Sequence, residues 1–108
     1  MTYTVIVSAE ATEDLERLAD HLFERELLPD LHQTGDLENA ADAIAHIRAS
    51  FFLLKRFPFT CRKAADSSFL RELVIPFGHT GYVALFEIVA REHIVIAAIR
   101  HQREDDYL

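Results

Sequence analysis

Side chains that can bind an anionic or acidic partner gather at the end of the chain. They are Arg100, His101, Arg103 and Tyr107. A guanidinium group donates paired hydrogen bonds to a carboxylate or phosphate, and an imidazole can donate or accept. These residues directly follow His93–Ile99, an apolar run that predicts a strand. Two interpretations stay open: a target-binding surface at the end of this strand, or a frayed terminus, because chain ends are usually mobile.

Charge is distributed unevenly along the chain, whose formal net charge is −7. Residues 1–47 hold 2 Lys and Arg against 11 Asp and Glu, a balance of −9, and residues 48–108 hold 9 against 7, a balance of +2. A second basic group, Lys55-Arg56 with Arg62-Lys63, is interpreted as a solvated loop. An acidic chain gains little from counterion release, so no direct sequence-specific binding of nucleic acid is expected.

The sequence offers no convincing catalytic or metal site. Asp42 and His46 stand four residues apart on a helical pattern, but no third ligand accompanies them, so a surface pair is expected. The single cysteine, Cys61, allows neither an internal disulfide nor a thiolate cluster. Glycine-rich phosphate loops, HExxH and GxSxG are absent from the sequence. We therefore predict no catalytic, cofactor-binding or metal-binding residues.

Length and composition suit one domain over residues 1–108, half of which are apolar. No apolar run reaches the roughly 18 residues that a membrane helix needs. The amino terminus, MTYTVIV, lacks the basic start and the longer apolar stretch of a secretory signal. Together with the single cysteine, these features predict a soluble cytoplasmic protein.

The first half of the chain predicts a strand and two helices. Tyr3–Val7 is a β-branched run, and Ser8 is a good N-cap for a helix that stops before Pro29. Polar residues 30–36 make the turn, and a second helical pattern ends before Pro58. The apolar stripes are Leu15, Leu18 and Leu22 in the first helix, and Leu37, Ala40, Ala41, Ile44, Ile47, Phe51 and Leu54 in the second.

From Phe69 onward the apolar period changes to two. It predicts three strands, Phe69–Ile75, Tyr82–Val89 and His93–Ile99, whose short connections force antiparallel neighbours. The helical hairpin should pack on one face of this meander, and the first strand should join the sheet at an edge. The predicted fold is therefore α+β, in the order β-α-α-β-β-β.

The short turns also predict the strand register. Turns centred on His79-Thr80 and Arg91-Glu92 pair Leu73 with Phe86, Ile75 with Ala84, Glu72 with Glu87, Phe86 with Ala97, Ala84 with Ile99 and Val83 with Arg100. One face is then apolar, with Leu73, Ile75, Tyr82, Ala84, Phe86, Val95, Ala97 and Ile99. The other mixes Val74, Val83, Leu85, Ile96 and Ala98 with Glu72, Glu87 and Arg100. So much aliphatic surface on an open sheet face predicts that another chain lies there.

This order of elements, together with four short motifs, resembles the RelE/ParE toxin superfamily of bacterial type II toxin–antitoxin systems. The motifs are Phe57-Pro58 followed by Arg62, Leu70-Arg71-Glu72-Leu73, Gly81-Tyr82 leading to Phe86, and the basic close Ile99–Asp105. The resemblance covers almost the whole chain and is closest to the ParE-like, plasmid-stabilisation branch.

The resemblance implies one of two activities. RelE-like members cleave mRNA on the ribosome, whereas ParE-like members inhibit DNA gyrase by binding. Aligned on Gly81-Tyr82, the strand lysines of the nuclease branch fall on Val74 and Pro76 and its arginine falls on Val83, none of which can stabilise a phosphate. Only Arg103 coincides with a position that is basic in the nuclease branch. A shift of the alignment by one or two residues would bring Arg71 or Arg100 onto such a position.

The ParE-like hypothesis is therefore favoured. It implies a protein that inhibits its target by binding, without a cofactor, and the target is DNA gyrase by analogy. The alternatives are a ribosome-dependent endoribonuclease and a non-toxic member that only binds its antitoxin. The implied target-contact candidates are Arg100, His101, Arg103, Tyr107 and Arg71. A ParD-like antitoxin would cover the open face, at Glu72, Val74, Val83, Leu85, Glu87, Ile96 and Ala98, and also Phe52. For Phe52, packing beneath the following loop is the open alternative, and for Arg100 a purely structural pair with Glu72 or Glu87.

Overall fold

The computed structural model describes residues 2–26, 40–78 and 80–103. The elements are β1 (Thr4–Val7), α1 (Ala9–Glu26), α2 (Ala40–Ser50), the 3₁₀ helices η2 (Phe51–Lys55) and η3 (Pro58–Thr60), β2 (Arg62–Lys63), β3 (Leu70–Phe77), β4 (Thr80–Ala90) and β5 (His93–His101). The described strands form one sheet in the order β1-β5-β4-β3-β2, with β1 parallel to β5 and the other neighbours antiparallel.

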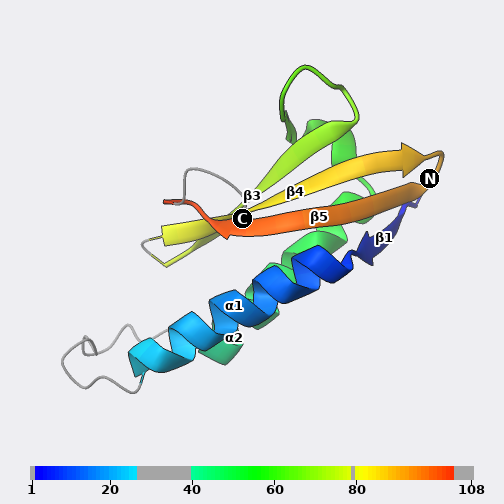
Figure 1. Cartoon of the computed structure of the whole chain (residues 1–108). Coiled ribbons are helices and arrows are strands. Elements are labelled where there is room, and N and C mark those ends of the chain that lie inside the picture. Colours follow the sequence, from blue (N-terminus) through cyan, green and yellow to red (C-terminus); the bar gives the residue numbers. More distant parts are fainter. Residues whose placement is uncertain (1, 27–39, 79, 104–108) are drawn as a thin grey trace.

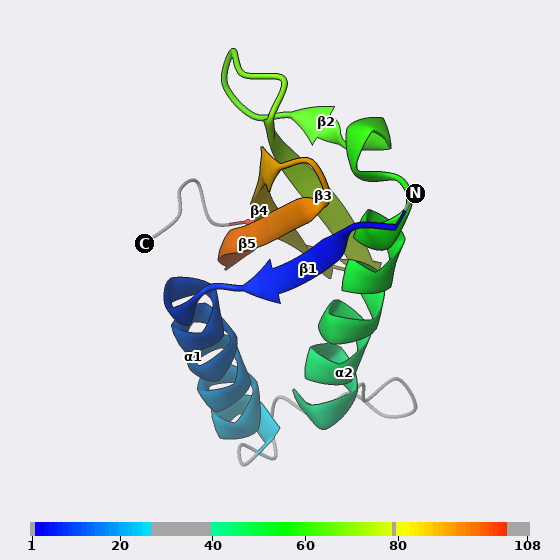
Figure 2. The same ribbon diagram turned by 90° about the vertical axis from the view of Figure 1, so that its right-hand side faces the viewer.

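Both long helices lie on the same side of this sheet, as Figures 1 and 2 show. The predicted α+β fold and the edge position of the first strand are thus confirmed. The short strand β2, at the opposite edge, was not predicted. Among the described helices, none is long and apolar enough to cross a membrane.

Helix α1 begins where the sequence predicts. The Ser8 hydroxyl accepts the N–H of Ala11 at 3.0 Å, which satisfies one of the backbone donors that a helix start leaves open. Ala11, Leu15 and Leu18 are buried against the sheet. The N-cap and the apolar stripe together account for this helix.

The second helical pattern continues as predicted but changes type. The α-helix ends at Ser50, and residues 51–55 form the 3₁₀ helix η2. Three residues per turn place Phe51 and Leu54 on one side, and both are buried. The stripe also runs through Ala43, which is 1% exposed, whereas Ala41 is exposed. The predicted position of Leu37 lies outside the described residues.

The register between β3 and β4 differs from the prediction by two residues. Phe77 pairs with Thr80, and Gly78 takes a positive φ of 60°, which glycine adopts without strain. Leu73 therefore faces Ala84, and Glu72 faces Leu85 instead of Glu87. A shift of two leaves every side chain on its predicted face, because the side-chain period is two.

A β-bulge changes the faces of β5. Val83 pairs with Arg100 and Ala84 with Ile99, as predicted, but Phe86 pairs with Ile96 because Ala97 is an extra residue. Beyond the bulge, Ile94 and Ile96 point into the core and are 0% exposed. The predicted core positions of Val95 and Ala97, and the predicted open-face position of Ile96, are therefore wrong.

Helix α1 also completes the edge of β5. Strand β1 ends at Val7, so the stretch of β5 beyond it needs other hydrogen-bond partners. The Ser8 hydroxyl donates to the carbonyl of Ala97 at 3.3 Å, and the Asp14 carboxylate accepts the N–H of Ile99 at 2.8 Å. These bonds place the end of β5 relative to α1.

Candidate partner-binding surface

The open sheet face is the one that points away from α1 and α2. On it, Ile6 and Val74 are 45% exposed, and Glu87 is exposed beside them. Leu85, Val95 and Ala98 are half-buried on the same face. Aliphatic surface of this extent on a sheet is suited to covering by a second chain.

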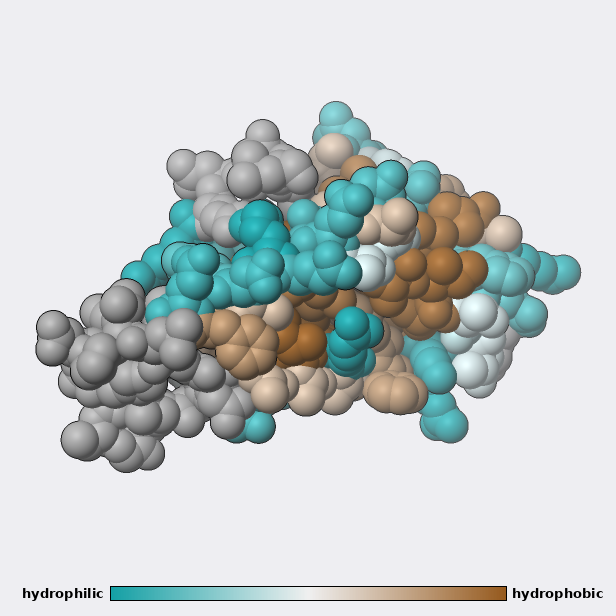
Figure 3. Space-filling model, turned by 60° about the horizontal axis from the view of Figure 1, so that its bottom comes forward, coloured by the Kyte–Doolittle hydropathy of each residue, from teal (hydrophilic) through white to brown (hydrophobic). Residues whose placement is uncertain are grey.

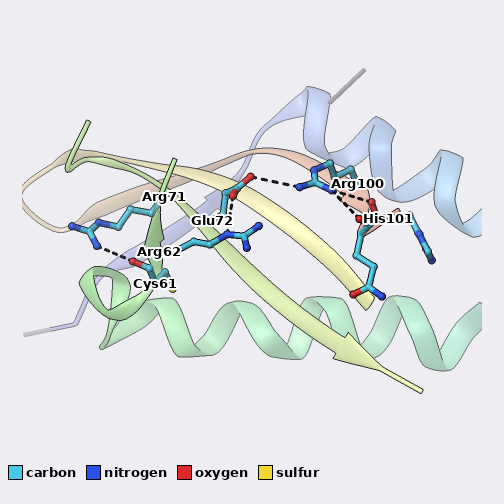
Figure 4. Close-up of polar contacts among 7 residues, drawn as sticks. Cys61, Arg62, Arg71, Glu72, Arg100 and His101 are labelled. Atoms are coloured by element: carbon cyan, nitrogen blue, oxygen red, sulfur yellow. Dashed lines mark hydrogen bonds and ion pairs between the residues drawn. The ribbon is translucent and has the colours of Figure 1, made fainter. Parts of the chain in front are cut away.

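A charged cluster crosses this face near the end of β5. Arg62 Nε donates to Glu72 Oε1 at 2.9 Å, and Arg100 Nη2 lies 3.9 Å from Glu72 Oε2. The Glu72 carboxylate thereby joins residues of β2, β3 and β5, as Figure 4 shows. The side chains of Glu72 and Arg100 are only 15% and 13% exposed, whereas that of Arg62 is 54% exposed. The structural pairing expected as the alternative for Arg100 is therefore present, with Glu72 and not with Glu87.

The cluster joins two guanidinium groups to one carboxylate. Arg100 Nη1 also donates to the carbonyls of His101 and Gln102, at 3.3 and 3.4 Å. These bonds hold the arginine along the end of β5. Guanidinium groups are the side-chain groups that pair most readily with a carboxylate or a phosphate.

His101 anchors the chain beyond Arg100. Its Nε2 lies 2.6 Å from the Thr80 hydroxyl, and its Nδ1 accepts the N–H of Arg103 at 3.1 Å. The ring meets Tyr82 edge to face, with centroids 5.5 Å apart. The N–H of Gln102 donates to the carbonyl of Gly81 at 2.9 Å. A frayed end therefore does not describe residues 100–103, whereas Tyr107 lies outside the described residues.

Gly81 permits this close packing. A Cβ on residue 81 would lie 2.7 Å from the Ile75 carbonyl oxygen and 3.0 Å from Gln102 Oε1. No other residue type fits without a shift of the backbone. The glycine of the Gly81-Tyr82 motif is thus explained by the close approach of Ile75 in β3 and of Gln102 to the start of β4.

Arg71, a predicted target contact, binds backbone carbonyls of the segment that precedes β3. Its guanidinium donates to the carbonyls of Phe59 and Cys61 at 3.0 and 2.8 Å, and to that of Ser68 at 2.8 Å (Figure 4 shows the Cys61 bond). Arg71 therefore fastens the segment between η3 and β3.

Of the residues predicted to contact an antitoxin, some lie at the surface of the sheet and others are buried. Glu72 belongs to the charged cluster, and Val74, Leu85, Glu87 and Ala98 lie on the open face. Val83 and Ile96 are buried, 3% and 0% exposed, and offer a partner almost no surface.

Phe52 lies in η2 and is 64% exposed, so it does not pack beneath the following loop. Arg62 was missed because a strand of two residues, β2, leaves no periodic signal in the sequence.

The described residues contain no group of three or more His, Cys, Asp and Glu placed to hold a metal ion. His46, half of the Asp42–His46 pair, also contacts the sheet: its Nε2 lies 2.8 Å from the Pro76 carbonyl oxygen. Its ring also packs on Phe77, with centroids 5.3 Å apart.

Comparison with known proteins supports the resemblance found in the sequence. The sequence model of the family described as "ParE toxin of type II toxin-antitoxin system, parDE" matches residues 5–106. A solved structure titled "Chromosomal ParDE TA system from P. aeruginosa" superposes with a TM-score of 0.61 at 19% identity, over 88% of this chain and 90% of that chain. No curated protein matches the sequence. The structural likeness shows the fold, and the family match spans nearly the whole chain: the protein belongs to the ParE toxins of type II toxin–antitoxin systems.

Proposed function

We propose that this chain is a cytoplasmic toxin that acts by binding and inhibiting DNA gyrase, and that a ParD-type antitoxin neutralises it. The observation that carries the proposal is the open sheet face with the Arg62–Glu72–Arg100 cluster at one end. Family membership supports the toxin role, and the solved relative is described as part of a ParDE toxin–antitoxin system. The gyrase target is an inference from the ParE-like branch.

The geometry favours inhibition by binding over RNA cleavage. Cleavage of a phosphodiester needs donors for the developing charge and a group that moves a proton. The positions where the nuclease branch carries bases are Val74, Pro76 and Val83 here, and Val83 is buried. A slip of register does not supply Arg71, whose guanidinium binds backbone carbonyls. His101 is held between Thr80 and the N–H of Arg103.

Neutralisation would follow from the position of the two surfaces. An amphipathic segment of the antitoxin would lie on the aliphatic part of the open face, around Val74, Leu85 and Ala98. The target would contact the end of β5, at Arg100, His101 and Arg103. Because Val83 pairs with both Val74 and Arg100, the two surfaces adjoin across β4. An antitoxin that covers the first surface then obstructs the second.

Expression of the toxin without its antitoxin tests this function. A gyrase inhibitor should cause filamentation and a DNA damage response, and the purified chain should inhibit supercoiling by gyrase. Transcript ends that map to cuts at fixed codon positions, with DNA intact, would instead show the endoribonuclease. Growth that continues unimpaired would show a member that only binds its antitoxin.

A further inference from the structure

The imidazole of His101 joins the end of β5 to the start of β4 through both of its ring nitrogens. Nδ1 accepts the backbone N–H of Arg103 at 3.1 Å, and Nε2 lies 2.6 Å from the Thr80 hydroxyl oxygen. A ring nitrogen that accepts a hydrogen bond carries no proton, so His101 must hold its proton on Nε2, which then donates to Thr80. The bond to Nδ1 therefore requires the neutral ring and this tautomer.

Protonation of the ring would affect its two hydrogen bonds differently. An imidazolium is a donor at both nitrogens, so its Nδ1 can no longer accept the N–H of Arg103. The bond from Nε2 to Thr80 persists, because that nitrogen is a donor in either state. The N–H of Gln102 still donates to the carbonyl of Gly81. One proton thus removes the attachment of residue 103 and leaves residues 101 and 102 attached to β4.

We propose that His101 is a pH-sensitive latch for the end of the chain. The neutral ring holds residue 103 in the turn that follows β5, and the imidazolium releases it. Histidine is the side chain that changes charge between about pH 5 and 8, so the latch responds near neutral pH. The latch itself does not depend on the proposed function, whereas its effect on binding of gyrase does.

Charged and titratable groups of several elements surround the latch. From β4, the buried ring of Tyr82 meets the imidazole edge to face. Arg100 and Arg103 flank it in the sequence, and their positive charges repel an imidazolium, which favours release of the chain end. From β3, Glu72 lies 3.9 Å from the Arg100 guanidinium. From α1, the Asp14 carboxylate binds the N–H of the residue two positions before the latch.

Further charges on α1 lie at the surface, where salt screens them. Figure 3 shows hydrophilic surface along the side of the molecule that the helices cover. The exposed titratable side chains of α1 include Glu10, Glu13, Glu16, Asp20, His21 and Glu24. Such charges influence the pH at which the ring is protonated, but the release itself follows from the loss of the acceptor at Nδ1. His79 and residues 104–106, which flank the latch in the sequence, lie outside the described residues.

Two substitutions separate the roles of the two ring nitrogens. His101→Asn keeps an acceptor close to the position of Nδ1, because an asparagine oxygen readily accepts the backbone N–H two residues further on. His101→Gln carries its amide further out, towards Thr80, and leaves the N–H of Arg103 without that acceptor. Neither amide changes charge with pH. The first variant should therefore be latched, and the second released, at every pH.

NMR spectroscopy of the full chain between about pH 5 and 8 tests the latch. Long-range proton–nitrogen spectra should show the proton of neutral His101 on Nε2. Protection of the Arg103 amide against hydrogen exchange, corrected for the intrinsic rate at each pH, should fall about fivefold as the ring becomes charged. Protection should stay constant in His101→Asn and low in His101→Gln. A neutral ring protonated on Nδ1, or an Arg103 amide that does not follow the titration of His101, overturns the proposal.

His79→Gln is the matched control, because His79 is the neighbour of Thr80 in the sequence and titrates in the same range. The response of the Arg103 amide to pH should survive this substitution. Its loss would assign the sensor to His79 and overturn the proposal. The acidic residues 104–106 change charge near about pH 4, below the range of the measurement.

The effect of the latch on a target is measured separately and rests on the proposed function. A released segment must be ordered again when it binds, so inhibition of gyrase by the parent chain should weaken at least about threefold from about pH 8 to about pH 6.5, relative to His101→Asn. The same pH dependence in both proteins would overturn this regulatory role. Absence of inhibition in both, at either pH, would contradict the proposed function, and the NMR measurement would still decide the latch.

Discussion

The carboxylate of Asp14 in α1 accepts the backbone N–H of Ile99 in β5 at 2.8 Å, although 85 positions separate the two residues. Asp14 is 7% exposed, and Arg17 lies 3.9 Å from its other oxygen. The residue that follows Ile99 is Arg100, the centre of the candidate target surface. One buried carboxylate therefore links the first helix to the strand that carries this surface.

Replacement of Asp14 by alanine should destabilise the fold. The buried N–H of Ile99 would lose its acceptor, which costs about 1–3 kcal/mol in free energy of unfolding. Glu16→Ala on the same helix is the control, because Glu16 is exposed and should change stability by less than about 0.5 kcal/mol. Urea denaturation measures both. Equal losses in the two variants would show that the Asp14–Ile99 bond contributes nothing specific.

Local signals in the sequence were sufficient to predict the helices and the existence of the long strands. Ser8 was predicted as an N-cap, and its hydroxyl does accept the N–H of Ala11. The period-two pattern through Leu73 and Ile75 predicted which face of β3 is buried. These features depend on residues close together in the chain, so a single sequence reveals them.

Features set by distant residues were not predictable in the same way. A turn between Phe77 and Thr80 preserves the pattern of β3 as well as the predicted turn did, so periodicity could not separate the two registers. The bulge at Ala97 lies beside another small residue, Ala98, and leaves no trace in composition. An acid near a helix start is common, so the type and position of Asp14 do not indicate its bond to Ile99, 85 positions away.

Gly81→Ala should destabilise the sheet, because the added Cβ would lie 2.7 Å from the Ile75 carbonyl oxygen. Relieving that overlap requires a backbone shift at the start of β4 and should cost about 1–3 kcal/mol. Gly78→Asn is a suitable comparison, since φ at Gly78 is 60° and asparagine tolerates this conformation. In thermal denaturation, the Tm of the Gly81→Ala variant should be clearly lower than that of the Gly78→Asn variant. A smaller change at Gly81 would mean that β3 and β4 can separate there at little cost.

Arg100→Ala tests the target surface. Arg100 supplies a largely buried positive charge at the end of β5, so its loss should weaken inhibition of gyrase supercoiling by about tenfold or more. Arg62→Ala is the informative control, because Arg62 pairs with the same carboxylate from the other edge of the sheet. Circular dichroism should show both variants folded. If Arg62→Ala and Arg100→Ala reduce inhibition equally, the Glu72 pairing itself matters, and Arg100 is not a target contact.

Ionisation of the Cys61 thiol should make the free energy of unfolding depend on pH in the alkaline range. Burial raises the pKa of Cys61 above the usual thiol value of 9.0, and the nearby charge of Arg71 opposes this only in part. The folded state therefore holds the thiol proton more tightly than the unfolded state does. The resulting contribution to stability is complete below pH 9.0 and is lost as pH rises through the higher folded-state pKa.

Cys61→Ala removes this ionisation, so its free energy of unfolding should fall less steeply than that of the parent chain above about pH 9. Guanidinium titrations of both proteins at several pH values between about 7 and 10.5 give the two slopes, and tyrosines and lysines titrate alike in each. The difference between the chains then isolates the thiol. Parallel pH dependences would mean that the Cys61 thiol ionises as readily in the folded protein as in the unfolded chain.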